Sequence, residues 1–361
     1  MPYLRYDNHI FTACEIFPTI CYGSPPEKVG VLSDLDKRSD IMSITSDFSK
    51  FKKIDAHSHI GTFGSPFNIH FNADLLLKQM EEFNIEKTIL CSDGPHTNEE
   101  TVAAFNAHPD KIIPLMWINC AEGKPAYDAL EHYIRDEHFA GAKLQSLFDG
   151  YCADDPCVDP VAEICEKYGL EPMIWSDMFF VTPGGGDYYN VPSDYEWPDS
   201  EKPDRRVTLV YWDYEGHDED RYTRMATLHK KLTDQVCFAG GAWIWNGLAP
   251  NYAQAMDATK KAFLGLEDTG VTDSFCTLWL DNGAETPMRA GLPMAAFYSR
   301  CAYGESTDPE EMESWFKMLC GESYQDMLLF DRLDHIPGTG VYNEGFANPS
   351  KQIFYQDPLT G

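Results

Sequence analysis

The chain has 361 residues, and 28 Lys and Arg against 58 Asp and Glu give a formal net charge of −30 at pH 7. Such a charge repels nucleic-acid phosphates and anionic lipid surfaces, so it argues against nucleic-acid and membrane partners. Hydrophobic residues make up 43% of the chain and charged residues 24%, a balance that is typical of a packed globular protein and excludes a disordered one.

The cysteines and the N-terminal residues point to a reducing compartment. The eleven cysteines are scattered, without the spacing of a zinc ribbon. The chain begins MPYLRYDNHIF, which lacks the basic and apolar pattern of a signal peptide. No apolar run approaches the ~20 residues of a membrane span. We therefore expect a cytoplasmic protein with free thiols.

Residues 1–50 show no clear period, and we expect them to form an N-terminal extension across the rest of the fold. From residue 51 a unit of apolar strand and helical stretch recurs about every 32 residues, the usual size of a βαβ unit. The predicted strands span residues 51–57, 87–92, 111–119, 139–147, 171–179, 207–214, 236–243 and 274–281. They are continuous apolar runs, which are typical of parallel strands buried on both faces.

Helical stretches are predicted at residues 74–85, 222–232 and 252–266, the first with Leu76, Met80 and Phe83 on one face. Eight strands with helical partners predict an α/β protein, a (β/α)8 TIM barrel over residues 51–304. An open doubly wound sheet is the alternative, but no glycine-rich turn follows an early strand. Residues 305–361 are predicted to form C-terminal helices and a tail.

Two histidines close the first predicted strand, which reads IDAHSHIG. Side chains of a strand alternate between its faces, so His57 and His59 point the same way. Two imidazoles on one face at the end of a barrel strand can ligate one divalent metal ion. The alternative is a pair of structural histidines, as we expect for His229 in the helical stretch TRMATLHKKL.

Residues from about 50 to 170 resemble the first half of the metal-dependent amidohydrolase superfamily, of the amidohydrolase 2 type. The resemblance lies in IDAHSHIG, TILCSD, PDKIIPLMWIN and FAGAKLQSLFDGYCADDPCVDPVAEICEKYGL. It implies that His57, His59 and Asp281 bind zinc or manganese, and that Lys143 stands where some members carry a bridging modified lysine. The chain departs from the family at Trp175, where a histidine is expected.

Tryptophans and acids gather at the ends of the later predicted strands. Indole rings stack on the C–H faces of sugars and carboxylates bind hydroxyl pairs, so this pattern predicts a carbohydrate site. The alternative is that single tryptophans fill the core. The tryptophans are Trp175, Trp212, Trp243, Trp245 and Trp279, and the acids are Asp177, Asp213, Asp281 and Glu285.

Residues from about 160 to 300 resemble the C-terminal half of the family 20 β-N-acetylhexosaminidases. The matching segments, in order, are PMIWSDMFF, LVYWDYEGHDEDRY, VCFAGGAWIWNGLAPN and SFCTLWLDNGAE. The resemblance implies that Tyr211 binds the 2-acetamido group, whose oxygen is the nucleophile in that family, and that Asp213 holds sugar hydroxyls. It further implies substrate binding by Trp175, Trp243, Trp245, Trp279, Asp281 and Glu285.

The family's adjacent Asp-Glu pair at the end of the fourth strand is missing. That segment reads KLQSLFDGY, and Asp149 is its only carboxylate. Asp149 or Asp177 would have to serve as the general acid, a role that typically contributes about 10²–10⁴ in rate.

The two resemblances meet near residue 165, so the barrel divides into halves at residues 51–165 and 166–304. The sequence predicts a glycosidase that acts on a small saccharide with a terminal N-acetylhexosamine and needs no cofactor. The alternatives are a metal-dependent amidohydrolase or decarboxylase that uses His57 and His59, and a carbohydrate-binding barrel without catalysis.

Overall fold

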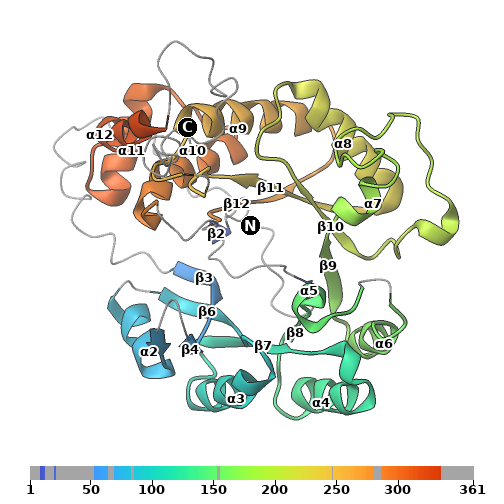
Figure 1. Cartoon of the computed structure of the whole chain (residues 1–361). Helices are drawn as coiled ribbons and strands as arrows, with labels where there is room; N and C mark the ends of the chain where they lie inside the picture. Colours follow the sequence, from blue (N-terminus) through green and yellow to red (C-terminus); the bar gives the residue numbers. More distant parts are fainter. Residues whose placement is uncertain are drawn as a thin grey trace, which may run out of the picture.

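Eight parallel strands that follow one another in chain order form the framework of the protein (Figure 1). The computed structural model describes residues 9–12, 20–21, 53–63, 69–82, 85–152, 155–245, 247–279 and 286–334. The eight strands are β3 (Lys53–Ser58), β6 (Ile85–Cys91), β7 (Ile112–Trp117), β8 (Gly141–Lys143), β9 (Glu171–Trp175), β10 (Thr208–Trp212), β11 (Gln235–Gly241) and β12 (Asp273–Thr277). This order confirms the predicted (β/α)8 arrangement with an N-terminal extension.

The N-terminal extension contributes two further strands to the same sheet. β1 (His9–Thr12) lies parallel between β8 and β9, and β2 (Ile20–Cys21) pairs antiparallel with β12. The full order is β2-β12-β11-β10-β9-β1-β8-β7-β6-β3. β2 also contacts β3, so the two edges of the sheet approach each other there. A regular barrel would pair β8 directly with β9, whereas here the extension is inserted between them.

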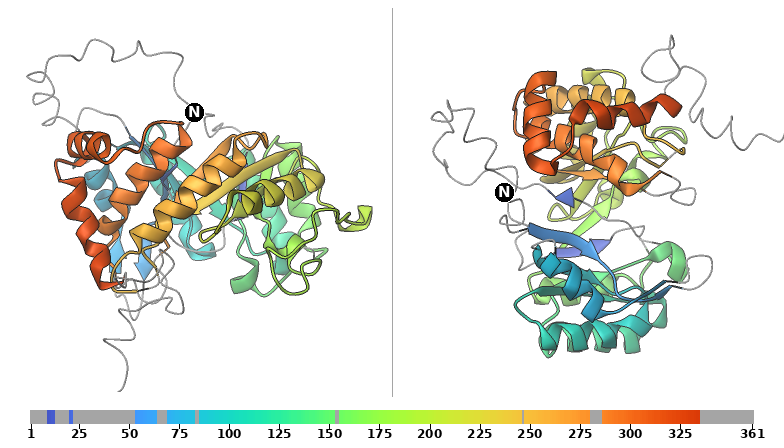
Figure 2. Two further views of the ribbon diagram at one scale, coloured as in Figure 1. Left: turned by 90° about the horizontal axis from the view of Figure 1, so that it is seen from above. Right: turned by 90° about the vertical axis from the view of Figure 1, so that its left-hand side faces the viewer.

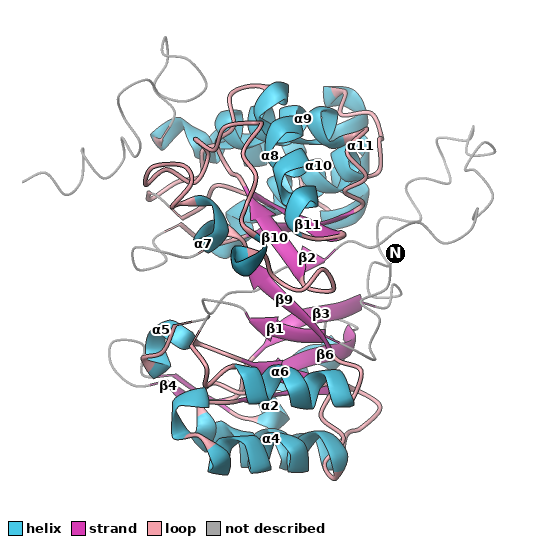
Figure 3. Ribbon diagram, turned by 90° about the vertical axis from the view of Figure 1, so that its right-hand side faces the viewer, coloured by secondary structure: helices cyan, strands magenta, loops and turns pink. Residues whose placement is uncertain are grey.

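Helices cover the strands in two groups, as Figures 1 and 2 show. The first group packs on β6 to β9 and comprises α2 (Ala73–Glu82), α3 (Asn98–Ala107), α4 (Lys124–Arg135) and α6 (Asp159–Lys167). The second group accompanies β10 to β12 and comprises α8 (Glu219–Leu232), α9 (Tyr252–Leu266), α10 (Leu292–Ala302), α11 (Pro309–Cys320) and α12 (Tyr324–Leu328). Figure 3 shows the strands between the two groups.

The helix predictions agree with the structure where it describes them, except that the first was predicted to reach residue 85, where β6 already begins. α9 has the predicted bounds, and α8 begins three residues earlier than predicted. Leu76 and Met80 of α2 are buried, as the periodicity predicts, and Phe83 lies outside the described residues. None of the helices in the described ranges is long and apolar enough to cross a bilayer.

The eighth predicted strand reached residue 281, but β12 ends at Thr277. Two other predicted strands extend into short helices. The fourth was predicted to reach residue 147, but β8 ends at Lys143 and α5 (Ser146–Asp149) follows. The fifth was predicted to reach residue 179, but β9 ends at Trp175 and α7 (Asp177–Phe180) follows. The apolar residues after β8 and β9 belong to short helical turns, and a run of apolar residues does not distinguish a strand from such a turn.

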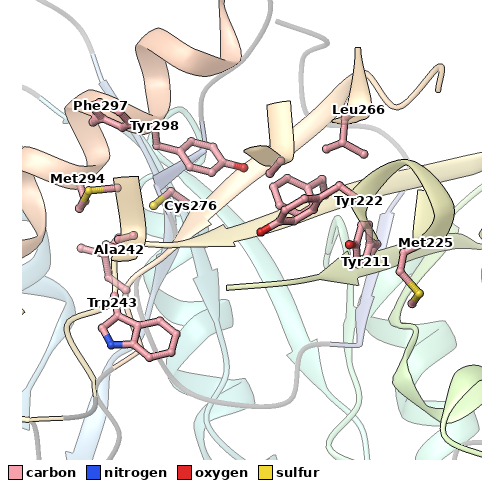
Figure 4. Packing of buried hydrophobic residues seen from close by; sticks show 14 of the residues in the cluster. Tyr211, Tyr222, Met225, Ala242, Trp243, Leu266, Cys276, Met294, Phe297 and Tyr298 are labelled. Atoms are coloured by element: carbon pink, nitrogen blue, oxygen red, sulfur yellow. The ribbon is translucent and has the colours of Figure 1, made fainter. Parts of the chain in front are cut away.

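The buried apolar side chains form separate clusters in the two halves of the chain. The largest cluster draws on residues 180–327 and lies between β10 to β12 and their helices; Figure 4 shows part of it. A second cluster draws on residues 116–170, and a third on residues 60–112. Each half of the sheet therefore has its own apolar packing against its own helices.

Candidate functional site

The carboxyl ends of β3, β6, β7 and β8 bring together a small group of polar side chains. The strands are parallel neighbours, so their carboxyl ends meet at one edge of the sheet. His57 lies on β3 with His59 just beyond it, Cys91 ends β6, Trp117 ends β7 and Lys143 ends β8. In a (β/α)8 protein this edge is the one that carries active sites.

The imidazoles of His57 and His59 face each other through their Nε2 atoms, which lie 2.9 Å apart. The other nitrogen of His59, Nδ1, lies 2.9 Å from the backbone carbonyl oxygen of Cys91. A carbonyl oxygen can only accept, so Nδ1 of His59 carries the proton and Nε2 presents its lone pair towards His57. The alternation of side chains along the strand, predicted from IDAHSHIG, therefore brings the Nε2 atoms of the two histidines together.

This pair has the geometry of two ligands to one metal ion. Metal–nitrogen bonds of about 2.0–2.1 Å leave two ligand nitrogens about 3 Å apart when the bonds are near a right angle. A backbone carbonyl that fixes the second nitrogen is also the usual support of a metal-binding histidine. No cluster of three or more potential ligands occurs within the described residues. Asp281, the further ligand that the sequence predicts, and Glu285 lie outside them.

Both histidines are held in their neutral form. Burial, helped by the Lys143 charge, lowers the pKa of His59 to about 4 against the opposing effects of Asp93 and of the Cys91 hydrogen bond. Burial, followed by His59 and Lys143, keeps the pKa of His57 well below its ordinary value. Neutral imidazole is the form that binds metal ions, so the pair is ready to bind at neutral pH.

Lys143 is fully buried at the end of β8, and its Nζ atom has no hydrogen-bond partner within the described residues. The ring of Trp117, its register partner on β7, lies 5.9 Å from Nζ. Trp117 Nε1 in turn donates to Asp149 Oδ2 at 3.1 Å. Burial raises the pKa of Asp149 above its ordinary value. Asp149 therefore joins this edge of the sheet through the indole of Trp117.

Tyr211 and Asp213 face α8 in the structure. The Tyr211 ring packs against Tyr222 (Figure 4) and against His229, and both of these residues lie on α8. Its hydroxyl donates to Asp213 Oδ2 at 3.1 Å. Tyr211 is 0% exposed and Asp213 1% exposed, so neither group presents a free polar atom to a saccharide in this structure.

The Asp213 carboxylate is the acceptor of a bidentate ion pair. Arg221 of α8 donates to it through Nε at 2.7 Å and Nη2 at 2.9 Å. The guanidinium also lies 3.6 Å from the centre of the Tyr189 ring. This arrangement is an internal ion pair that ties β10 to α8.

The five tryptophans of the predicted carbohydrate site fall into two groups, because the Tyr214 ring contacts both Trp212 and Trp245. Trp243 and Trp245 are buried with ring centroids 4.9 Å apart. Trp212 stacks on Tyr188 and Tyr214. Trp175 and Trp279 are partly buried with centroids 5.7 Å apart, and Trp175 also meets Phe275 of β12. Since β10 and β11 separate β9 from β12, the contact between Trp175 and Phe275 crosses the concave side of the curved sheet.

Asp177, the other carboxylate predicted as a general acid, begins α7, directly beyond β9.

Two parts of the site were not predicted from the sequence. One is the carbonyl of Cys91, since a backbone acceptor has no signal in the sequence. The other is Trp117, which lies near the end of its predicted strand, as the Trp residues of the later strands do, and ends β7. Its position at a strand end was the signal that could have identified it.

Comparisons with known proteins give weak matches. No family model and no curated protein matches the chain. One similar solved structure is 5-carboxyvanillate decarboxylase from Novosphingobium aromaticivorans, determined with manganese and 3-methoxy-4-hydroxy-5-nitrobenzoic acid (10% identity, TM-score 0.42, 74% of this chain and 98% of that chain). Others are 4-oxalomesaconate hydratase from Rhodopseudomonas palustris (15%, 0.39, 78% and 98%) and 2,6-dihydroxybenzoate decarboxylase from Rhizobium (13%, 0.34, 78% and 98%). Scores at this level do not assign an activity, so the interpretation depends on the chain's own residues.

Proposed function

We propose that the protein is a metal-dependent enzyme of the amidohydrolase type that acts on a small molecule. The observation that carries this proposal is the convergence of His57 and His59, whose Nε2 atoms lie 2.9 Å apart. Both would hold a divalent ion, with Asp281 as a further ligand. Such an ion acts as a Lewis acid on an oxygen atom of the substrate.

The chain's own residues supply three further functions at this edge. The Cys91 carbonyl orients the His59 ring and keeps its Nε2 lone pair available. The buried Lys143 ammonium offers positive charge beside the two histidines. Asp149, with its raised pKa and its hydrogen bond from Trp117, would exchange a proton with a bound molecule.

The glycosidase function has less support in the structure. It requires Tyr211 and Asp213 to contact a sugar, whereas both are buried against α8 and bonded within the protein. Because the Asp-Glu pair of the glycosidase family is missing, Asp149 would have to be the general acid. Its carboxylate accepts a hydrogen bond from Trp117 at the end of β7. It is therefore linked to the half of the sheet that carries His57 and His59.

The proposal is tested by metal content. The purified full chain, stripped with a chelator and then dialysed against zinc or manganese, should retain about one equivalent by elemental analysis. The variant His57→Ala/His59→Ala should retain none, because both predicted nitrogen ligands are gone. The control variant His70→Ala/His132→Ala removes two exposed histidines and should bind metal as the wild type does.

Two results would contradict the proposal: a wild-type protein that stays metal-free after reconstitution, or a double variant that retains the ion. Hydrolysis of an aryl N-acetylglucosaminide by the metal-free protein would support the glycosidase function in its place.

A further inference from the structure

Lys143 has an ammonium group without a counter-ion in the part of the chain that the structure describes. The side chain is 0% exposed and Nζ has no hydrogen-bond partner there. An ammonium taken out of water without a partner costs several kcal/mol, so proteins pair such groups or supply them with a ligand. The unmet donors of Lys143 therefore need an acceptor that the described chain does not provide.

Two carboxylates near this edge are engaged elsewhere. Asp55, on β3, accepts the backbone N–H of His57 at 3.1 Å. Asp149 accepts from Trp117 Nε1 at 3.1 Å. Neither forms an ion pair with Lys143, although the Lys143 charge acts on both His57 and His59. Within the described residues no carboxylate forms an ion pair with Nζ, so a molecule bound where the two imidazoles meet can supply its acceptor.

We propose that Lys143 is an anion-binding residue and that the molecule bound beside His57 and His59 carries a carboxylate. One ammonium neutralises one negative charge, so a singly charged carboxylate fits this buried position better than a dianion such as phosphate. The link between this carboxylate and the reaction rests on the proposed metal-dependent function. The anion site itself depends only on Lys143, so it is tested without metal.

The test uses the metal-free full chain and acetate as the probe. At constant ionic strength, acetate should raise the melting temperature of the wild type in a saturable way, and chloride should not. The variant Lys143→Met keeps the length of the side chain and removes its charge. It should melt at a higher temperature than the wild type without acetate, and should bind acetate at least about tenfold more weakly, the loss expected for one hydrogen bond to a charged group.

The control is Lys111→Met, which removes the same charge next to the amino end of β7, at the opposite edge of the sheet. It should respond to acetate as the wild type does. As a measurement that needs no variant, 13C-labelled lysine side chains of the wild type should show one Nζ-adjacent signal that shifts with acetate and saturates at the same concentration.

Three results would overturn the inference. In the first, Lys143→Met responds to acetate as the wild type does. In the second, phosphate or chloride binds as tightly as acetate, which would indicate a general anion site. In the third, 13C NMR of the wild type in labelled bicarbonate shows a carbamate on Lys143, which would make the lysine a modified residue. Metal content is measured separately, so a protein that binds zinc but not acetate would refute the anion site and leave the proposed metal site standing.

Discussion

His229 of α8 is a core histidine, unlike the pair at the candidate site, and its burial predicts how the stability of the protein depends on pH. Its side chain is 0% exposed. Nδ1 lies 2.7 Å from the Met225 carbonyl oxygen and Nε2 2.7 Å from Ser176 Oγ. The carbonyl can only accept, so the neutral ring donates from Nδ1 and accepts at Nε2. Both nitrogens are used inside the core.

Burial lowers the pKa of His229 to about 3, against a smaller opposing effect of the Met225 hydrogen bond. In the unfolded chain the pKa returns to about 6.5. As pH falls through 6.5, the unfolded state binds a proton that the folded state does not, so stability falls with pH. Between pH 7 and pH 5 this single group should remove about 2 kcal/mol from the free energy of unfolding.

The assay is urea denaturation of the wild type and of His229→Gln at pH 7 and at pH 5. The glutamine cannot titrate, so the loss of stability between the two pH values should be about 2 kcal/mol smaller in the variant. His57 and His59 are present in both proteins, and their contributions cancel. His132→Gln, a substitution at an exposed position of α4, is the control for the change of residue. An equal pH dependence in wild type and His229→Gln would refute the reasoning.

Two further predictions concern the second half of the sheet. Arg221→Met leaves the buried Asp213 carboxylate without its ion-pair partner, which should lower the free energy of unfolding by about 3–5 kcal/mol in urea denaturation; a loss below about 1 kcal/mol would contradict the burial of that charge. Gly240→Ala would place Cβ 2.4 Å from Cε2 of the fully buried Tyr298, and the clash should cost about 1–3 kcal/mol; an unchanged melting temperature would show that the ring can move aside.

Much of the fold could be predicted because its signals are local. Apolar strand segments recur at the spacing of βαβ units, and the period of 252–266 gives the bounds of α9. The position of β1 between β8 and β9 could not be predicted. That pairing joins segments more than 100 residues apart, and residues 1–50 carry no alternation that would mark a strand. Strand pairing at such a distance depends on the whole sheet rather than on the segment.

The candidate site was predicted in part, and the same rule explains the success and the failure. Alternation along a strand places His57 and His59 on one side, and it also places Tyr211 and Asp213 on one side. For the histidines, the side that they share is enough to make a pair. For Tyr211, the predicted function also depends on which face of the sheet its side chain lies on. The pattern of β10 does not show this, because the strand is apolar on both faces, with Leu209 and Val210 both buried. The packing against α8 decides the direction, and the sequence pattern does not show it.

Hydrogen-bond satisfaction then distinguishes the buried histidines by role. His229 has an acceptor for Nδ1 and a hydroxyl donor for Nε2, so a metal ion would find no free lone pair there. His59 has an acceptor for Nδ1, but its Nε2 faces the Nε2 of another imidazole. In that arrangement His57 must donate from Nε2, and any ion that replaces this proton gains two nitrogen ligands at once. The fixed tautomer of His59, beside a Lys143 ammonium that has no hydrogen-bond partner among the described residues, is typical of a binding site rather than of a core.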